Sequence, residues 1–487
     1  MVPSSSPTED ARSLESLIVL SDVHLGSDLD DAPGAPRLSS RTSEVDADLA
    51  ALLDHYALEP PPSGTWRLVV DGDLFDFLRA RVHGRPGDDA FGTPLTEEER
   101  AHGLGGAAPH AVAKLDALVD RHPAVFSALR RFLDAGHAVT IIRGNHDVDL
   151  HWQAVQDRAR ERISGGDPTL GARVAFSPWF VYAEGLAFIE HGQQYDDLCA
   201  ANNLLAPLSP IDTDRTEPGL CDVLNRFVVR PSKGLWEYGH EGRGGLGFLW
   251  YAAGIGIVEA TRVGLRSLRA LRALFQLRAA RRGPNGAEAR RIHEARVRGL
   301  AEANAWAEPR LAALLGLHVE PATNSALGIA SCMLFDRVAL ALALGPTSLL
   351  CTFFGFWSFK FMIVGLVGIA AWVFGHRELT RIRRRNMAET LEARAADVAA
   401  ITEVRYVVMG HTHGPRVVPL PRGEATYVNL GSWSEEALAD GRPLERATRT
   451  HLVVDASTRT AELREWLPAS ERARAGAPYR AFVTSSP

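Results

Sequence analysis

The sequence has few cysteines, and it has neither an apolar segment like that of a signal peptide nor an excess of positive charge. Its four cysteines form no Cys-x-x-Cys pair, so they suggest neither a disulfide framework nor a thiolate metal site, and we expect a reducing compartment. Residues 1–16 are rich in serine, proline and charge and lack the apolar core of a signal peptide, so we expect a disordered tail there. The net charge of −6 does not indicate nucleic acid as a partner.

Five short blocks of aspartate, asparagine and histidine each follow an apolar run of β-strand length. The runs are at residues 17–20, 68–70, 139–142, 186–189 and 406–409. The blocks are Asp22-Val23-His24, Gly72-Asp73-Leu74-Phe75-Asp76, Gly144-Asn145-His146-Asp147, His191-Gly192 and Gly410-His411-Thr412-His413. Nearly continuous apolar runs are typical of strands buried on both faces, and α/β folds usually place ligands at strand ends. One block alone also fits a surface turn or a buried structural histidine, but five in this order predict a two-metal hydrolytic site.

The ligand chemistry of the blocks is a mixture of nitrogen and oxygen, with no cysteine. That set favours Mn²⁺, Fe or Zn²⁺ over Ca²⁺, which prefers oxygen ligands alone. Two such ions about 3.5–4 Å apart would share one carboxylate and polarise a bridging hydroxide. Asp73 is the expected bridge, because it stands between two other ligand blocks and follows the turn-forming Gly72.

In order and composition, these blocks resemble those of the calcineurin-like metallophosphoesterases. The resemblance implies an α/β (α+β) fold, a four-layer β-sandwich flanked by helices, with a catalytic domain over residues 17–191 and 400–470. His146 would stabilise the transition state or protonate the leaving oxygen, with Asp147 or Asp76 available to orient it. The resemblance assigns one metal to Asp22, His24, Asp73 and His413, and the other metal to Asp73, Asn145, His191 and His411.

The expected reaction is hydrolysis of a phosphate ester or a pyrophosphate. A metal-bridging hydroxide can attack phosphorus in line while two cations offset charge on the phosphoryl oxygens. No covalent intermediate is expected, because the attack needs no protein nucleophile. Arg79 and Arg81 follow Asp73 in a segment rich in glycine and proline, so they are candidates for binding substrate phosphate. The alternative is that this segment is a solvated surface loop.

An apolar stretch with almost no charge lies between the fourth and fifth blocks. From residue 326 to residue 375 the only charged residues are Asp336, Arg337 and Lys360. A membrane-spanning helix needs about 20 apolar residues. We therefore predict an apolar hairpin of two helices over these residues, turned at Gly345-Pro346.

A basic amphipathic helix is predicted ahead of the hairpin, at about residues 262–298. Eleven arginines there accompany two acids, with apolar residues mostly three and four positions apart, and such helices often lie on anionic membrane surfaces. The alternative is a cap whose apolar faces pack together in water.

The ends of the insert, residues 192–399, must return to one metal site, so the chain would cross a membrane an even number of times. Arginines from Arg377 onward follow the hairpin, and by the positive-inside rule they indicate the cytoplasmic side. We therefore expect a cytoplasmic catalytic domain attached to the inner face of the cell membrane.

A membrane-attached phosphohydrolase would act on a lipid-linked phosphate or pyrophosphate. Within the family there is a weaker similarity to the UDP-2,3-diacylglucosamine pyrophosphatases, which also carry a helical insert before a Gly-His-Thr-His block. Those enzymes typically have arginine at the position of His146, and their insert is shorter. One alternative is a soluble protein phosphatase or nucleotide phosphodiesterase with a packed helical cap. Another is a non-enzymatic, membrane-associated scaffold. Residues 471–487 are expected to form a tail.

Overall fold

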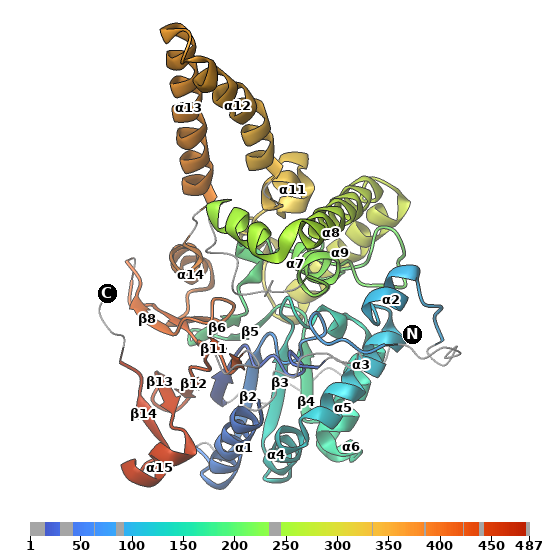
Figure 1. The fold of residues 1–487 in the computed structure, drawn as a ribbon. Helices are drawn as coiled ribbons and strands as arrows, with labels where there is room; N and C mark the ends of the chain where they lie inside the picture. The colour runs from blue at the N-terminus through green and yellow to red at the C-terminus, as the bar shows by residue number, and fades with distance from the viewer. Residues whose placement is uncertain are drawn as a thin grey trace.

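Two mixed β-sheets form the centre of the protein (Figure 1). This computed structural model describes residues 15–29, 42–62, 64–83, 92–232, 245–333, 335–383, 386–421, 423–437 and 443–483. The seven-stranded sheet contains, in spatial order, β14 (Tyr479–Ala481), β13 (Thr460–Trp466), β12 (Thr450–Asp455), β1 (Ser16–Leu20), β2 (Trp66–Asp71), β3 (Ala138–Ile142) and β4 (Val174–Ser177). The five-stranded sheet contains β5 (Phe180–Ala183), β6 (Ala187–Glu190), β7 (Tyr406–Met409), β9 (Thr426–Asn429) and β8 (Arg416–Pro419). With 52% helix beside these sheets, the predicted α/β (α+β) class is confirmed.

The two sheets pack face to face. Leu17 and Val19 of β1 lie in a core that also contains Ile189 of β6 and Val408 of β7. The intervening side chains of β1 point the opposite way and pack under helices, because side chains alternate along a strand. Helices on both outer faces then give four layers in all.

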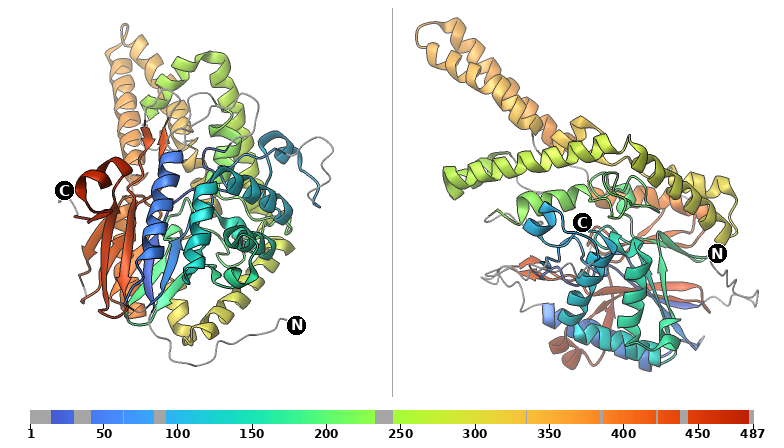
Figure 2. Two further views of the ribbon diagram at one scale, coloured as in Figure 1. Left: turned by 90° about the horizontal axis from the view of Figure 1, so that it is seen from below. Right: turned by 90° about the vertical axis from the view of Figure 1, so that its right-hand side faces the viewer.

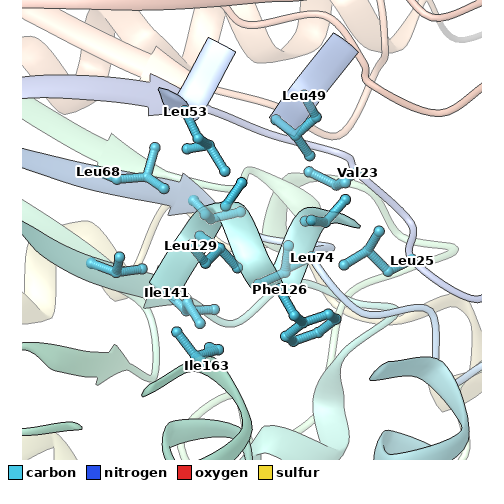
Figure 3. Packing of buried hydrophobic residues seen from close by; sticks show 14 of the residues in the cluster. Val23, Leu25, Leu49, Leu53, Leu68, Leu74, Phe126, Leu129, Ile141 and Ile163 are labelled. Carbon is cyan, nitrogen blue, oxygen red and sulfur yellow. The ribbon is translucent and has the colours of Figure 1, made fainter. Parts of the chain in front are cut away.

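Helices of the N-terminal half cover the seven-stranded sheet. They are α1 (Thr42–Leu58), α3 (Ala108–Arg121), α4 (Pro123–Asp134) and α5 (Gln153–Ser164). In Figure 3, Leu49 and Leu53 of α1 and Leu129 of α4 lie near Leu68 of β2 and Ile141 of β3. All five side chains are exposed by no more than 3%. Burying one side chain of this size contributes roughly 1.5–3 kcal/mol, so this core holds the strands that carry the first three blocks.

Helices of the insert and α14 (Met387–Thr402) cover the five-stranded sheet. The insert supplies α9 (Pro284–Ala303) and α10 (Glu308–Leu315) to this layer. Trp306, between them, stacks on Phe180 of β5 with ring centroids 5.2 Å apart. The insert therefore shares a hydrophobic core with the five-stranded sheet.

All five predicted strands are present, and their carboxyl ends are arranged to meet. β1, β2 and β3 are parallel neighbours. β6 and β7 are also parallel neighbours, with Ile189 opposite Val408, although the insert separates them in the chain. Each block of candidate ligands follows one of these carboxyl ends.

Two predictions about the insert are wrong in detail. The basic helix expected over residues 262–298 is two helices, because α8 (Gly245–Ala280) ends and α9 begins at Pro284. Proline cannot continue the preceding helix but suits the first turn of a new one. The apolar hairpin is formed by α12 (Phe335–Phe354) and α13 (Phe359–Arg383), after the short helix α11 (Ala326–Cys332).

The turn of the hairpin lies between Phe354 and Phe359, not at Gly345-Pro346. Pro346 is inside α12, where it removes one backbone hydrogen bond without ending the helix. The hairpin projects away from the sheets, and α8 passes between its base and the rest of the protein (Figures 1 and 2).

The chain boundaries also differ from those predicted. Residues 1–14 of the expected N-terminal tail lie outside the described residues, whereas Ser16 already belongs to β1. The expected C-terminal tail contains β14, which pairs with β13 through Arg480 and Glu465 and extends the sheet. Helix α15 (Ala469–Ala475) connects these strands, so the fold that contains the two sheets continues past residue 470.

Candidate metal centre

The five blocks converge on one buried site. The Oδ1 atom of Asp22 lies 3.1 Å from Nε2 of His413 and 3.7 Å from Nε2 of His24. The Oδ2 atom of Asp73 lies 3.1 Å from Nε2 of His191 and 3.8 Å from Nε2 of His24. Candidate ligand atoms from four loops therefore face one another, and the space between them could hold a cation.

Two overlapping groups of these side chains could hold a metal ion. One contains Asp22, His24 and His413, and the other contains Asp22, Asp73 and His191, with ligand atoms within 4.8 Å of one another. Oδ1 of Asn145 lies 3.2 Å from Nε2 of His191, which adds an amide oxygen to the second group. The sequence predicted Asp73 as the shared carboxylate, and here both Asp22 and Asp73 lie between the groups.

The carboxylate of Asp22 fits a cation better than it fits the protein groups around it. Its Oδ1 atom is buried and accepts no hydrogen bond from the described residues. Three imidazole nitrogens nevertheless lie within 4.0 Å of it, those of His24, His191 and His413. Nitrogen lone pairs and a carboxylate oxygen that converge in this way are the donor set preferred by Mn²⁺, Fe or Zn²⁺.

The backbone of the site is held in an uncommon conformation. Asp22, His24, Asp73, His411 and His413 all have φ between 52° and 67°, in the left-handed region. Only a few per cent of non-glycine residues adopt it, and outliers of this kind cluster at functional sites because the surrounding structure must enforce them.

Close backbone approach explains two of the glycines in the blocks. A Cβ atom at Gly144 would lie 2.2 Å from Oδ1 of Asp73, and one at Gly410 would lie 2.5 Å from Oδ2 of Asp22. Neither position accepts a side chain unless the neighbouring carboxylate moves.

Each of three imidazoles is oriented by a partner outside the site. Nδ1 of His191 lies 2.8 Å from the carbonyl oxygen of Asp71, which leaves Nε2 facing Asp73. Nδ1 of His24 lies 3.3 Å from Asp76. For His411 the arrangement is reversed, because its Nε2 lies 3.1 Å from Oδ2 of Asp196. Outer partners of this kind fix the tautomer and the direction of metal-ligating histidines.

Burial and charge oppose each other at the carboxylates. Burial alone would raise the pKa of Asp22, but the charges of His413 and His191 hold it well below its usual value. Burial would also raise the pKa of Asp73, and the charges of His191 and His146 lower it. Both carboxylates are therefore ionised near neutral pH, as ligands to a cation must be.

The same negative charge acts on the imidazoles. Burial lowers the pKa of His24, but the neighbouring carboxylates of Asp22 and Asp76 outweigh it and raise that pKa to about 10. Burial likewise lowers the pKa of His191, which the charges of Asp73 and Asp22 raise to about 10. The site thus attracts positive charge, which two divalent cations would supply in exchange for these protons.

Asp76 is the orienting carboxylate for His146. Its Oδ1 atom lies 2.9 Å from Nδ1 of His146, while its Oδ2 atom faces Nδ1 of His24. Burial lowers the pKa of His146, but the charges of Asp76 and Asp73 raise it to about 9. Asp76 therefore orients the imidazole of His146 and favours its protonated form, and the same carboxylate also contacts the candidate ligand His24.

Asp147 has a different place. It is buried and accepts hydrogen bonds from the backbone N–H groups of Gly144, at 2.6 Å, and Leu74, at 3.0 Å. It therefore joins the loops after β3 and β2. Burial and the charge of Asp73 raise the pKa of Asp147 to about 7. The sequence offered Asp147 or Asp76 to orient His146, whereas these contacts place Asp147 on the backbone of the two loops, as a positioning residue.

The two arginines predicted to bind substrate lie away from the open space at the site. Arg79 is 5% exposed, and its guanidinium lies 3.6 Å from Oδ2 of Asp76. The guanidinium of Arg81 lies 3.3 Å from Nε2 of His83. Neither side chain lines the cavity beside the metal-ligand cluster.

That cavity has a volume of about 380 Å³. Its lining includes Asn145 and His146, and also Leu220 of α7 (Leu220–Leu224), Phe227 and Leu277 of α8. Its cationic side chains are engaged with acids, as in the 2.9 Å pair of Lys114 and Asp149. Residues of the loops after the strands and residues of the insert therefore line it together.

Sequence reasoning missed Asp196 and the cavity. Asp196 follows the 3-10 turn Gln193–Tyr195 just beyond the fourth block, and nothing in its spacing distinguishes it from a surface acid. The cavity depends on how the insert folds back, which motif spacing does not encode. Comparison with models of protein families and with curated proteins gives no match to this chain.

Proposed function

We propose that this protein is a dimetal phosphohydrolase that cleaves a phosphate ester or a pyrophosphate, similar to the calcineurin-like metallophosphoesterases. One observation carries the proposal: five strand ends bring seven nitrogen- and oxygen-bearing side chains to one buried place. They are Asp22, His24, Asp73, Asn145, His191, His411 and His413.

These residues would hold two divalent ions, Mn²⁺ or Fe and Zn²⁺, which would activate water and offset charge on the phosphoryl oxygens. The chain's own contribution to proton transfer is His146. Its Nδ1 atom is held by Asp76, and its Nε2 atom, which has no hydrogen bond to the described residues, would donate a proton to the leaving oxygen. Asp147 keeps the loop of Asn145 and His146 in place through the Gly144 N–H group.

The substrate we favour is a lipid-linked phosphate ester or pyrophosphate. The cavity supports this choice, because His146 and apolar side chains such as Leu220, Phe227 and Leu277 line the same space. A phosphoryl group at the metal-ligand cluster would place the rest of an amphiphilic substrate along these side chains.

A metal-replete activity screen tests the proposal. Purified protein with Mn²⁺, Fe²⁺ or Zn²⁺ is assayed against UDP-diacylglucosamine, nucleotide pyrophosphates, cyclic nucleotides and a phosphopeptide. We expect hydrolysis that chelation abolishes and that Asp73→Asn eliminates. The matched control is Asp157→Asn, because Asp157 lies on α5 with a side chain that is 59% exposed.

Two outcomes would contradict the proposal. Full activity in metal-replete Asp73→Asn would remove the metal centre from the mechanism. Protein that binds two metals and hydrolyses none of the four substrates would favour the scaffold alternative. Hydrolysis of cyclic nucleotides or the phosphopeptide alone would keep the reaction class and replace the lipid-linked substrate.

A further inference from the structure

The hairpin of α12 and α13 is packed through its smallest residues. A Cβ atom at Gly365 would lie 2.3 Å from Oγ1 of Thr352, and one at Gly368 would lie 2.1 Å from Oγ of Ser348. The helices therefore touch where Ser348 and Thr352 face glycines. Close approach through small residues is how helices pair in lipid, where apolar side chains gain little from facing each other.

Large apolar side chains point outward from both helices. On α12, Leu342 is 70% exposed and Leu349 is 63% exposed, and on α13 Val367 is 62% and Phe374 is 67% exposed. In a water-soluble hairpin these side chains would form the seam and the small residues would lie outside. Here the small residues form the contact between the helices and the large apolar residues face outward. This arrangement is suited to an apolar solvent.

The dimensions of the hairpin match a bilayer. Helix α12 has 20 residues, which gives a length of about 30 Å, equal to the thickness of a typical hydrocarbon core. Asp336 and Arg337 stand at its base, and Lys360 follows the turn at its tip. Lys360 thus lies at the one place in the hairpin where a lysine can reach the far interface, beside Trp357, which is 74% exposed.

The hairpin is apolar on all of its exposed sides. This distribution indicates what kind of partner could cover it. Both helices have the length and composition of membrane spans, and only 17% and 6% of their most apolar windows are buried. Figure 1 and the right-hand view of Figure 2 show the hairpin projecting away from the rest of the protein. A second copy would cover one side and leave the others in water, whereas lipid covers all sides.

Helix α8 presents a second apolar surface near the base of the hairpin. Ile257 is 84% exposed, Leu265 is 55% exposed and Leu268 is 52% exposed. The opposite side of α8, with Leu274 and Leu277, is buried in the insert. Arg262, beside this surface, pairs with Glu259 at 3.1 Å but is 62% exposed, so its outer N–H groups can also face anionic headgroups.

We infer that α12 and α13 cross a lipid bilayer as a two-helix hairpin, with the Trp357–Lys360 turn at the far interface and α8 lying on the near surface. The inference is independent of the reaction catalysed at the metal centre. It assigns a lipid partner to a surface that the catalytic fold does not use.

Carbonate extraction of membranes from cells that express the full chain tests this inference. Wild-type protein should stay in the pellet, and the double variant Leu342→Asp, Val367→Asp should move to the supernatant. One aspartate at the centre of a spanning helix lowers the insertion equilibrium roughly a hundredfold. The matched control, Leu58→Asp with Val483→Asp, changes two residues that are 82% and 81% exposed outside the hairpin and should stay in the pellet.

A second measurement covers the case in which the double variant aggregates. Ser358→Cys, in a chain whose native cysteines are replaced by serine, should react with a membrane-impermeant maleimide added outside intact cells. Release of wild-type protein by carbonate would overturn the inference, as would labelling only after permeabilisation. A soluble wild-type dimer that the two aspartates dissociate would assign the surface to a second copy instead.

Discussion

Asp196 provides the sharpest test of how the metal centre is organised. Its carboxylate accepts a hydrogen bond from Nε2 of His411 at 3.1 Å, so the ring nitrogen that would bind a metal ion is Nδ1. A hydrogen bond to a charged group contributes roughly 1.5–3 kcal/mol. If that energy orients a ligand, Asp196→Ala should weaken one of two metal sites roughly 10- to 150-fold. Asp196→Asn keeps a neutral acceptor and should lose about half of that free energy.

Calorimetric titration of metal-free protein with Mn²⁺ measures this effect. Wild-type protein should bind two ions, and the Asp196 variants should retain one affinity and lose part of the other. Asp157→Asn on α5 carries the same change of charge and should bind both ions as wild type does. Equal weakening of both sites would show a general electrostatic effect. Unchanged binding in Asp196→Ala would refute the role assigned to this carboxylate.

Three further predictions test other parts of the structure. His146→Ala should slow hydrolysis by roughly 10²–10⁴-fold while calorimetry still finds two bound ions, and loss of an ion would contradict its role as a proton donor. Burial lowers the pKa of His451 to about 3, so its contribution to stability is complete above the unfolded value near 6.5 and is lost as the pH falls toward 3. When the pH falls from 7 to 5, the free energy of unfolding measured in urea should fall by about 2 kcal/mol less in His451→Gln than in wild type. An equal fall in both proteins would refute this. Trp306→Ala should lower the free energy of unfolding by about 3–5 kcal/mol in one transition, whereas two separate transitions would show that the insert unfolds alone.

The sequence was sufficient to predict the strands and the convergence of the candidate ligands because each depends on local residue order. A buried strand such as Val139–Ile142 requires a continuous apolar run, and a ligand such as Asn145 requires the turn that follows it. The roles of the carboxylates were harder to predict. Asp76 and Asp147 are both near His146 in the expected site, and only the fold shows that Asp76 reaches the ring while Asp147 holds backbone.

The hairpin turn shows why local propensity failed in the insert. Gly345-Pro346 is a strong turn signal in water, but tertiary packing of α12 against α13 outweighs it. Gly355 begins the actual turn, and its position follows from the pairing of Thr352 with Gly365. Pairing between helices is a long-range property, so single-residue preferences could not locate it.

The pairing of β6 with β7 has a consequence for the order of assembly during synthesis. Ile189 leaves the ribosome roughly 200 residues before its neighbour Val408, a delay of roughly 10–40 s at ordinary elongation rates. Throughout that delay the five-stranded sheet lacks its central strand, and His191 has no His411 beside it. The apolar hairpin is made within the same interval. The candidate metal centre is therefore complete only after the hairpin has emerged. A nascent chain whose hairpin misfolds would contain only part of that centre.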